Sequence, residues 1–246
     1  MTGGARGVGA AVARALAEAG MTVAVHARAD LAAAKDVVAA LPGDGHVAVT
    51  GDLADPEEVR TFVAEAVAAL GDVDVLVNNA GIYTEQPITS TSYEEWIAQW
   101  RRITDVNLLG TANVTWCFVD HLRTRQRGPE GARIITVGSR GAYRGEPDAP
   151  AYGASKAAVH SLTQSLAVSL APLDIAVTAV APGFVDTDMT AHLLTGDRAA
   201  AIRAQSPFGR VATPEDVASA VAWLATPGAG WASGAVIDLN GASHLR

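Results

Sequence analysis

Short apolar runs alternate with longer alanine-rich stretches along the whole chain. The runs are rich in valine and isoleucine and predict strands at Thr22–Ala27, His46–Thr50, Val73–Val77, Arg133–Val137, Ile175–Val180 and Ala235–Leu239. The stretches between them have the apolar spacing of helices, which we expect at Val8–Ala19, Ala29–Leu41, Pro56–Leu70, Tyr93 to about Gln126, Ala151–Leu170 and Pro214–Ala225. This alternation is typical of a parallel sheet built from βαβ units.

Strands that are apolar throughout, rather than alternately apolar and polar, belong to sheets with helices on both faces. We therefore predict an α/β fold with a doubly wound, Rossmann-like parallel sheet. No repeat or linker-like segment divides the chain, so residues 1–246 are predicted to form a single domain. The less periodic stretch Asp186–Phe208 follows a Pro-Gly pair and is interpreted as a substrate lid.

Composition and charge narrow the functional classes. The formal net charge of -8, with 18% charged residues against 49% hydrophobic ones, describes a folded acidic domain rather than a partner of nucleic acid or anionic membrane. No signal-peptide pattern and no apolar run of about 18 residues occurs, so we expect a cytoplasmic protein. The single cysteine, Cys117, excludes an intrachain disulfide, and the histidine spacing predicts no metal site.

A glycine-rich loop opens the chain. Gly3, Gly7 and Gly9 lie in Thr2–Gly9, which leads into the first turn of the helix predicted from Val8. Glycines allow a sharp turn, and the N–H groups of a helix N-terminus bind pyrophosphate. The spacing G-x-x-x-G-x-G differs from the commoner G-x-G-x-x-G, and a flexible glycine-rich start remains an alternative from this loop alone.

The position about 20 residues further on discriminates between the two nicotinamide cofactors. An acidic residue there binds the ribose 2′-hydroxyl of NAD, whereas arginine accommodates the 2′-phosphate of NADP. This chain has Ala27-Arg28, and Arg6 in the glycine loop offers a second cation. We predict that NADP(H) is preferred and that NAD(H) is possible, the alternative being two ordinary surface arginines.

Seven strings in a fixed order make the sequence resemble the short-chain dehydrogenase/reductase family. They are TGGARGVG from Thr2, GDL from Gly51, NNAG from Asn78, VN at Val106-Asn107, Ser139, YGASK from Tyr152 and PGFVDT from Pro182. The general pattern is most similar to that of 3-oxoacyl-carrier-protein reductases. The resemblance implies one NAD(P)-binding domain with carbonyl/alcohol oxidoreductase activity.

The resemblance also implies roles for individual residues. Asp52 and Leu53 would surround the adenine, and Asn79, Ala80 and Gly81 would pack along the cofactor. The loop carrying Pro182, Gly183, Val185 and Thr187 would hold the nicotinamide carboxamide. The implied catalytic tetrad is Asn107, Ser139, Tyr152 and Lys156, and the implied assembly is a homotetramer built through the long helices around Asn107 and Lys156.

The chemistry of the tetrad can be argued from its residue types. Hydride reduction of a ketone produces an alkoxide that needs a proton, and a phenol with a pKa of about 10 is a slow donor at neutral pH. Lys156 is four residues after Tyr152 on a predicted helix, so both share one face. Together with oxidised nicotinamide it would lower the phenol pKa by about 3 units, or about 4 kcal/mol.

Ser139 and Asn107 complete this interpretation. Ser139 ends a strand and would donate to the developing alkoxide. Asn107, a poor helix former within a predicted helix, would hold a water that relays protons to Lys156. The alternatives are a turn serine and a solvent-facing helix residue.

The chain departs from the family pattern at its start. The family has a central strand before the glycine loop, whereas Met1 stands where that strand would end. A parallel sheet without its middle strand leaves unpaired backbone groups and a gap in the core. We therefore expect that the true start lies upstream of Met1.

The second departure concerns the substrate. Ser165–Ile175 contains no basic residue for an acidic carrier protein, although Arg123, Arg125 and Arg127 cluster elsewhere. A small ketone or alcohol is therefore preferred over a carrier-bound 3-oxoacyl thioester. A non-catalytic cofactor-binding scaffold or sensor would be expected to lack a tetrad member, and a methyltransferase would leave the Tyr-Lys pair without a role.

Overall fold

A computed structural model describes residues 1–246, apart from the side chain of Asp197. Its strands all run parallel and form two groups. The first group pairs β1 (Ala24–Ala27) with β2 (Val47–Thr50). The second has the order β3-β4-β5-β6 and consists of Val75–Asn78, Arg133–Val137, Ala176–Pro182 and Val236–Leu239. The six predicted strands are therefore confirmed, each within about two residues at its ends.

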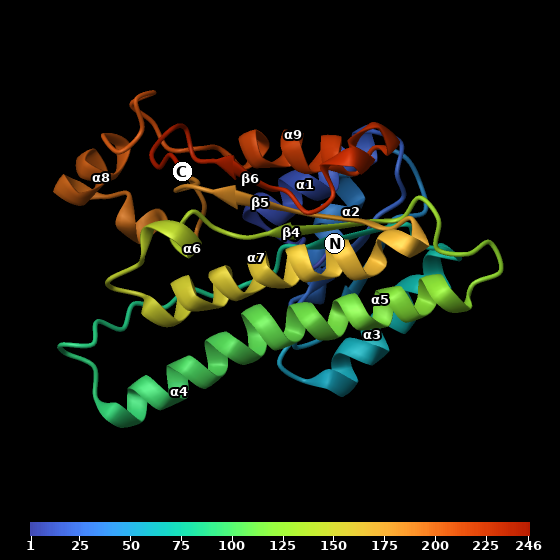
Figure 1. The fold of residues 1–246 in the computed structure, drawn as a ribbon, viewed down its shortest axis with the longest axis horizontal. Helices are drawn as coiled ribbons and strands as arrows, with labels where there is room; N and C mark the ends of the chain where they lie inside the picture. Colours follow the sequence, from blue (N-terminus) through green and yellow to red (C-terminus); the bar gives the residue numbers. More distant parts are fainter.

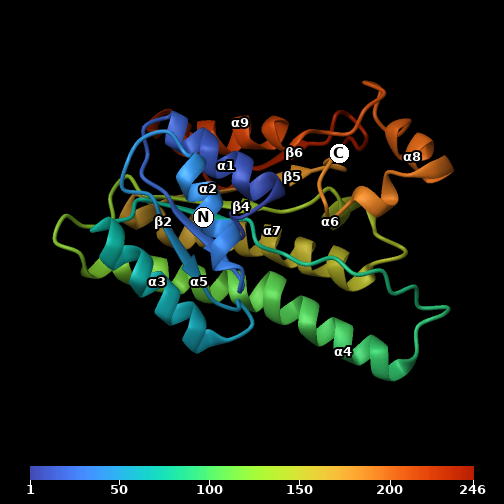
Figure 2. The same ribbon diagram turned by 180° about the vertical axis from the view of Figure 1, so that it is seen from behind.

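Helices cover both faces of the strands (Figures 1 and 2). One layer contains α1 (Gly7–Glu18), α2 (Leu31–Ala40) and α9 (Pro214–Leu224), which bury one apolar cluster with the strands. The other contains α3 (Pro56–Leu70), α5 (Thr111–Thr124) and α7 (Pro150–Leu170), which bury a second. This arrangement confirms the predicted α/β fold.

The helix starts follow from local sequence. The Asp55 carboxylate accepts hydrogen bonds from the backbone N–H groups of Glu57 and Glu58 at the start of α3. A capping box formed by Ser92 and Glu95 starts α4 (Tyr93–Thr104). These side chains satisfy the N–H groups that helices leave free at their first turn.

Three helical features differ from the prediction. The long helix predicted from Tyr93 is interrupted by a π-helical turn, η1 (Asp105–Gly110), between α4 and α5. The short helices α6 (Gly141–Arg144) and α8 (Gly196–Arg203) were not predicted, and α8 lies within the lid excursion. Four residues are too few to give a periodic signal, and α8 has no marked apolar face. Short 3₁₀ turns occupy Ala171–Leu173, Ala191–Leu193 and Pro227–Ala232.

The first residues of the chain form backbone hydrogen bonds to both groups of strands. The Met1 amino group donates to Ala24 O at 3.1 Å, and Met1 O accepts from His26 N at 3.0 Å. On the opposite side, Thr2 N donates to Val77 O at 3.0 Å. Met1 and Thr2 thus lie between β1 and β3 as the last two residues of a strand would.

Behind Met1, the space between β1 and β3 is a cavity of about 340 Å³, here called the strand slot. Its walls include the apolar side chains of Val23, Phe62, Val75 and Phe118. The Met1 amino group is buried at one end, and this burial lowers its pKa to about 6. The strand slot therefore lies between the two groups of strands.

Candidate functional site

The loops that follow the strands come together at the carboxyl edge of the sheet, where ligands bind in folds of this kind. The glycine loop Thr2–Gly9 lies against the loop after β5, because a Cβ added to Gly7 would be 3.3 Å from Thr187 Cγ2. It also lies against the loop after β3, because a Cβ added to Gly3 would be 2.9 Å from Ala80 Cα. Three of the predicted cofactor-binding segments therefore share one edge.

The glycine loop has the shape of an anion-binding turn. Gly3 and Gly7 have positive φ angles of 62° and 52°, which side chains other than glycine rarely adopt. A Cβ on Gly9 would collide with Gly3 O. The α1 N-cap, Arg6, supplies no capping side chain, and the first turn of α1, which includes Val8, contains no acidic residue. Its N–H groups are therefore suited to a phosphate.

Asn79 braces this loop from the end of β3. Its side-chain nitrogen donates to Thr2 O at 3.1 Å and to Gly3 O at 3.0 Å. The Thr2 hydroxyl in turn accepts from the backbone N–H groups of Asn79 and Ala80, at 3.0 and 3.1 Å. The Asn79 side chain thus shapes the glycine loop through these bonds.

His26, which the sequence gave no reason to select, holds the same loop from β1. Its Nδ1 accepts from Gly3 N at 3.2 Å, and its Nε2 lies 2.9 Å from Gly51 O. Burial lowers the pKa of His26 to about 4, so the ring is neutral at pH 7 and Nε2 carries the proton. The only feature of the sequence that could have pointed to His26 is its place in an otherwise alanine- and valine-rich strand.

The two arginines predicted to contact the ribose phosphate are exposed. Arg28 follows the end of β1, and Arg6 is in the glycine loop. Among the described residues, neither has a carboxylate oxygen within 4 Å. Both guanidinium groups therefore remain available to an anion.

The two residues predicted to surround the adenine, Asp52 and Leu53, make more contacts within the protein than expected. Burial raises the pKa of Asp52, but hydrogen bonds from Ala54 and Arg102 outweigh it and lower that pKa overall. The ion pair to Arg102 has an N–O distance of 2.9 Å. Leu53 is only 4% exposed and belongs to the apolar core. It packs closely against Gly110, where an added Cβ would be 2.7 Å from Leu53 Cβ.

Ser139, Tyr152 and Lys156 lie together, as the spacing predicts. Lys156 Nζ is 5.7 Å from the centre of the Tyr152 ring, and it donates to Val137 O at 2.9 Å. The Ser139 hydroxyl, which accepts from Gly141 N at 3.0 Å, is close enough to Tyr152 to lower the pKa of the phenol. A carbonyl oxygen placed between these two hydroxyls would meet two donors.

Burial dominates the pKa values of Tyr152 and Lys156. Burial raises the pKa of Tyr152 to about 12, against the smaller opposing effect of Ser139. Burial also lowers the pKa of Lys156 to about 8. In the chain by itself, desolvation of the phenolate outweighs the effect of its neighbours. The lowered phenol pKa, which was predicted with oxidised nicotinamide bound, stays a prediction.

Asn107 is buried within η1 at 2% exposure, so the alternative of a solvent-facing residue is wrong. Its Oδ1 accepts from Ile82 N at 2.8 Å, and its Nδ2 donates to Ile82 O at 3.0 Å and to Ser155 Oγ at 3.1 Å. These bonds fix the loop after β3 against α7. A Cβ added to Gly81 would be 3.4 Å from both Asn107 Oδ1 and Lys156 Nζ, which places the two side chains next to each other.

The loop after β5 closes the site from the side of β6. Pro182 ends β5, and Gly183 N donates to Leu239 O at 3.1 Å. Val185 is 8% exposed, while the Thr187 hydroxyl is 3.3 Å from that of Thr190. This loop reaches the start of α1 through Thr187 and Gly7.

Further residues that the sequence did not reveal surround Tyr152. The Tyr83 ring meets the Tyr152 ring edge-on with 5.2 Å between centres. The Glu146 carboxylate is close enough to oppose ionisation of Tyr152. Arg198 on α8 donates to Glu85 at 2.8 Å and so ties α8 to the loop that carries Tyr83. Loop residues of this kind have no periodic pattern that would identify them in advance.

Two other features bear on function. Within the described residues, no group of three or more His, Cys, Asp or Glu side chains is arranged to hold a metal ion. None of the helices described here combines the length and hydropathy required to traverse a bilayer.

The comparisons with known proteins agree with this geometry. Residues 3–244 match the family model described as enoyl-(acyl carrier protein) reductase. The cis-4-hydroxycyclohexanecarboxylate dehydrogenase of Sinomonas cyclohexanicum is 40% identical over 98% of this chain and 94% of its own. The 3-oxoacyl-acyl-carrier-protein reductase of Haemophilus influenzae is 34% identical over 100% of this chain and 97% of its own.

Solved structures give the same result. A short-chain dehydrogenase from Burkholderia cenocepacia in complex with NADP has a TM-score of 0.89 and 34% identity, covering 100% of this chain and 96% of that one. A 3-ketoacyl-(acyl-carrier-protein) reductase from Brucella melitensis, complexed with NADH, has a TM-score of 0.88 and 34% identity, covering 99% and 96%. The chain therefore belongs to the short-chain dehydrogenase/reductase family.

Proposed function

We propose that this protein is an NADPH-preferring oxidoreductase that interconverts small ketones and secondary alcohols. The observation that carries the proposal is the grouping of Ser139, Tyr152 and the buried Lys156 at the carboxyl edge of the sheet, beside a glycine loop with positive φ angles. The same edge offers the uncapped N-terminus of α1 to a pyrophosphate. A bound nicotinamide would supply the hydride.

The protein's own residues handle the carbonyl and the proton. Ser139 donates a hydrogen bond to the substrate oxygen, and Tyr152 gives its proton to the oxygen as negative charge develops there. With a pKa of about 12, Tyr152 holds its proton fully at neutral pH. The positive charge of oxidised nicotinamide, together with protonated Lys156, would favour the phenolate once the proton has left.

Lys156 and Asn107 are assigned to replacing that proton. Lys156 uses one of its three donors on Val137 O. A second would bond the nicotinamide ribose, and the third faces the side of Asn107, where a relaying water would sit. In this arrangement Asn107 also positions the loop after β3 through its bonds to Ile82.

The cofactor preference rests on Arg28 and Arg6, whose charges have no ion-pair partner among the described residues. Replacing Arg28 with alanine is expected to weaken NADPH binding about 10- to 100-fold, because a charge-assisted bond to the 2′-phosphate is lost. NADH binding should change less than twofold. Titrating each cofactor into wild type and Arg28→Ala measures both; equal losses for the two would refute the phosphate assignment.

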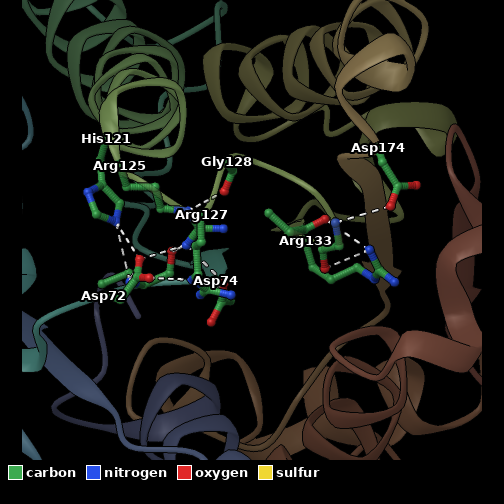
Figure 3. Close-up of polar contacts among 11 residues, drawn as sticks. Asp72, Asp74, His121, Arg125, Arg127, Gly128, Arg133 and Asp174 are labelled. Carbon is green, nitrogen blue, oxygen red and sulfur yellow. Dashed lines mark hydrogen bonds and ion pairs between the residues drawn. The ribbon is translucent and has the colours of Figure 1, made fainter.

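A small ketone or alcohol fits better than an acidic acyl carrier, because two of the three clustered arginines are already neutralised. Arg125 pairs with Asp72 at 2.7 Å and with Asp74 at 2.9 Å, and Arg127 pairs with the same two carboxylates (Figure 3). The network sits at the amino end of β3, opposite the carboxyl edge that holds Tyr152. The 3-oxoacyl thioester remains the second candidate, supported by the relatives named for that substrate.

The test of the proposed function is a panel of ketones and secondary alcohols assayed with NADPH and NADH. Cyclic substrates belong in it because two relatives are named for cyclic alcohols, a hydroxycyclohexanecarboxylate and a 3beta-hydroxysteroid. Turnover of a free ketone supports the proposal. Turnover of an acyl-carrier thioester alone favours the second candidate, and cofactor binding without any turnover favours a scaffold or sensor.

We also propose a homotetramer built through the long helices around Asn107 and Lys156. Large apolar side chains on these helices are exposed, with Leu109 at 50%, Trp116 at 64% and Val168 at 79%. Such residues are typical of an interface. Light scattering is expected to give four times the chain mass, and a Trp116→Glu variant is expected to shift it to smaller species; a monomeric wild type would refute this assembly.

A further inference from the structure

Arg140, the residue after Ser139, is a buried cation with neutral hydrogen-bond partners. It is 5% exposed, and its Nη1 donates to Gln205 Oε1 at 3.0 Å and to Ser243 Oγ at 2.7 Å. Its guanidinium also stacks over the Phe184 ring at 5.2 Å. Among the described side chains, no carboxylate oxygen lies within ion-pair distance of it.

Burying the Arg140 guanidinium costs free energy of folding, because a buried charge without a counter-ion loses its hydration and forms no ion pair that would offset this loss. The charge of Glu146 acts on Arg140, but from beyond ion-pair distance, and the nearby Arg144 opposes it. Arg144 also shares Gln205 Oε1 with Arg140. The surroundings of Arg140 therefore favour an added negative charge.

Arg140 lines a pocket of about 300 Å³, here called the C-terminal pocket, between the end of α8 and the residues after β6. Phe184, Ile202 and Phe208 give it an apolar wall. Its other charged residues have partners of opposite sign. Arg210 pairs with Asp216 at 2.5 Å, and Asp238 pairs with Arg246 at 2.9 Å. Arg140 is thus the cation in this pocket that lacks a carboxylate among the described residues.

We propose that the C-terminal pocket binds the carboxylate of a small organic acid, with Arg140 as the anion-binding group and the apolar wall against the hydrocarbon body. Nε and Nη2 of Arg140 make no hydrogen bond to the described residues and match the two oxygens of a carboxylate. The volume suits a chain of about six to eight carbons. Ser139 and Tyr152 do not line this pocket, so it is separate from the reduction site.

The test is a titration of the cofactor-free protein with hexanoate and, separately, with 1-hexanol, followed by calorimetry and by the NMR signals of the Ile202 methyl groups. We expect saturable binding of hexanoate that shifts these signals, and binding of hexanol at least tenfold weaker. Arg140→Gln is expected to weaken hexanoate binding at least tenfold. Arg101→Gln, which removes an exposed arginine on α4, is the matched control and should change nothing.

A second variant keeps Arg140 but fills the C-terminal pocket. Val211→Trp places an indole in the pocket and should also weaken hexanoate binding at least tenfold. This variant tests the proposal if Arg140→Gln does not fold. Absent binding, equal binding of acid and alcohol, or binding unchanged in the folded variants would overturn the proposal. The titration needs neither NADPH nor ketone, so its outcome is independent of the proposed reductase activity.

Discussion

Replacing Tyr152 with phenylalanine is expected to lower kcat for ketone reduction at least about 1000-fold while NADPH binding changes less than about twofold. The variant keeps the ring that packs against Tyr83 but loses the hydroxyl beside Ser139. The alkoxide would then have no positioned proton donor. Steady-state rates with the best ketone, together with an NADPH titration, measure the two quantities separately.

Tyr83→Phe is the matched control, because this second tyrosine lies in the same site. Its ring centre is 5.2 Å from that of Tyr152, but its hydroxyl points to Glu85 at 3.4 Å. We expect its kcat to stay within about threefold of wild type. If Tyr152→Phe kept more than a tenth of the activity, or if Tyr83→Phe abolished it, the assignment of the proton donor would be wrong.

Joining an extended segment of five apolar, β-branched residues to the amino end of Met1 is expected to raise Tm by about 10 °C. The segment would enter the strand slot, where Met1 and Thr2 already bond to Ala24, His26 and Val77. Backbone groups of parallel strands bond alternately to either side, so Ala24 N–H and Val77 N–H face the slot. The extension also converts the buried amino group of Met1 into an amide.

The size of this effect follows from apolar burial. Four or five buried side chains contribute about 1.5–3 kcal/mol each, against about 1.5 kcal/mol of conformational entropy per ordered residue, which leaves a few kcal/mol. At about 2–4 °C per kcal/mol for a chain of this size, the change is about 10 °C. A Gly-Ser extension of equal length is the control and should leave Tm unchanged; equal effects of the two extensions would show that the slot does not accept a strand.

The fold could be predicted because its signals are local. Each strand is a short valine- and isoleucine-rich run, and Arg133–Val137 was placed without error because it is buried along its whole length. The long helix from Tyr93 was predicted without its π-helical turn at Asp105–Gly110, since one extra residue in a turn barely changes the apolar period. The helix α8 was missed because its two faces are similarly polar.

The candidate site was only partly predictable, for a physical reason. Tyr152 and Lys156 are four residues apart on one helix, so their sequence spacing fixes their distance. His26, Tyr83 and Arg140 act through partners that are distant in the chain, namely Gly3, Tyr152 and Gln205. The pKa values of the site could not be predicted from the sequence either. The burial that raises the pKa of Tyr152 to about 12 is a property of the packed site.

The most direct test of the central claim, that Ser139, Tyr152 and Lys156 support hydride reduction of a carbonyl, is to follow deuterium from NADPH labelled at the transferable C4 position. With a ketone that the protein turns over, the alcohol is expected to carry one deuterium on its carbinol carbon, and Tyr152→Phe is expected to give none above background. If NADPH binds but no ketone or thioester in the panel yields deuterated alcohol, the proposed activity is contradicted and the chain is a cofactor-binding protein without this chemistry.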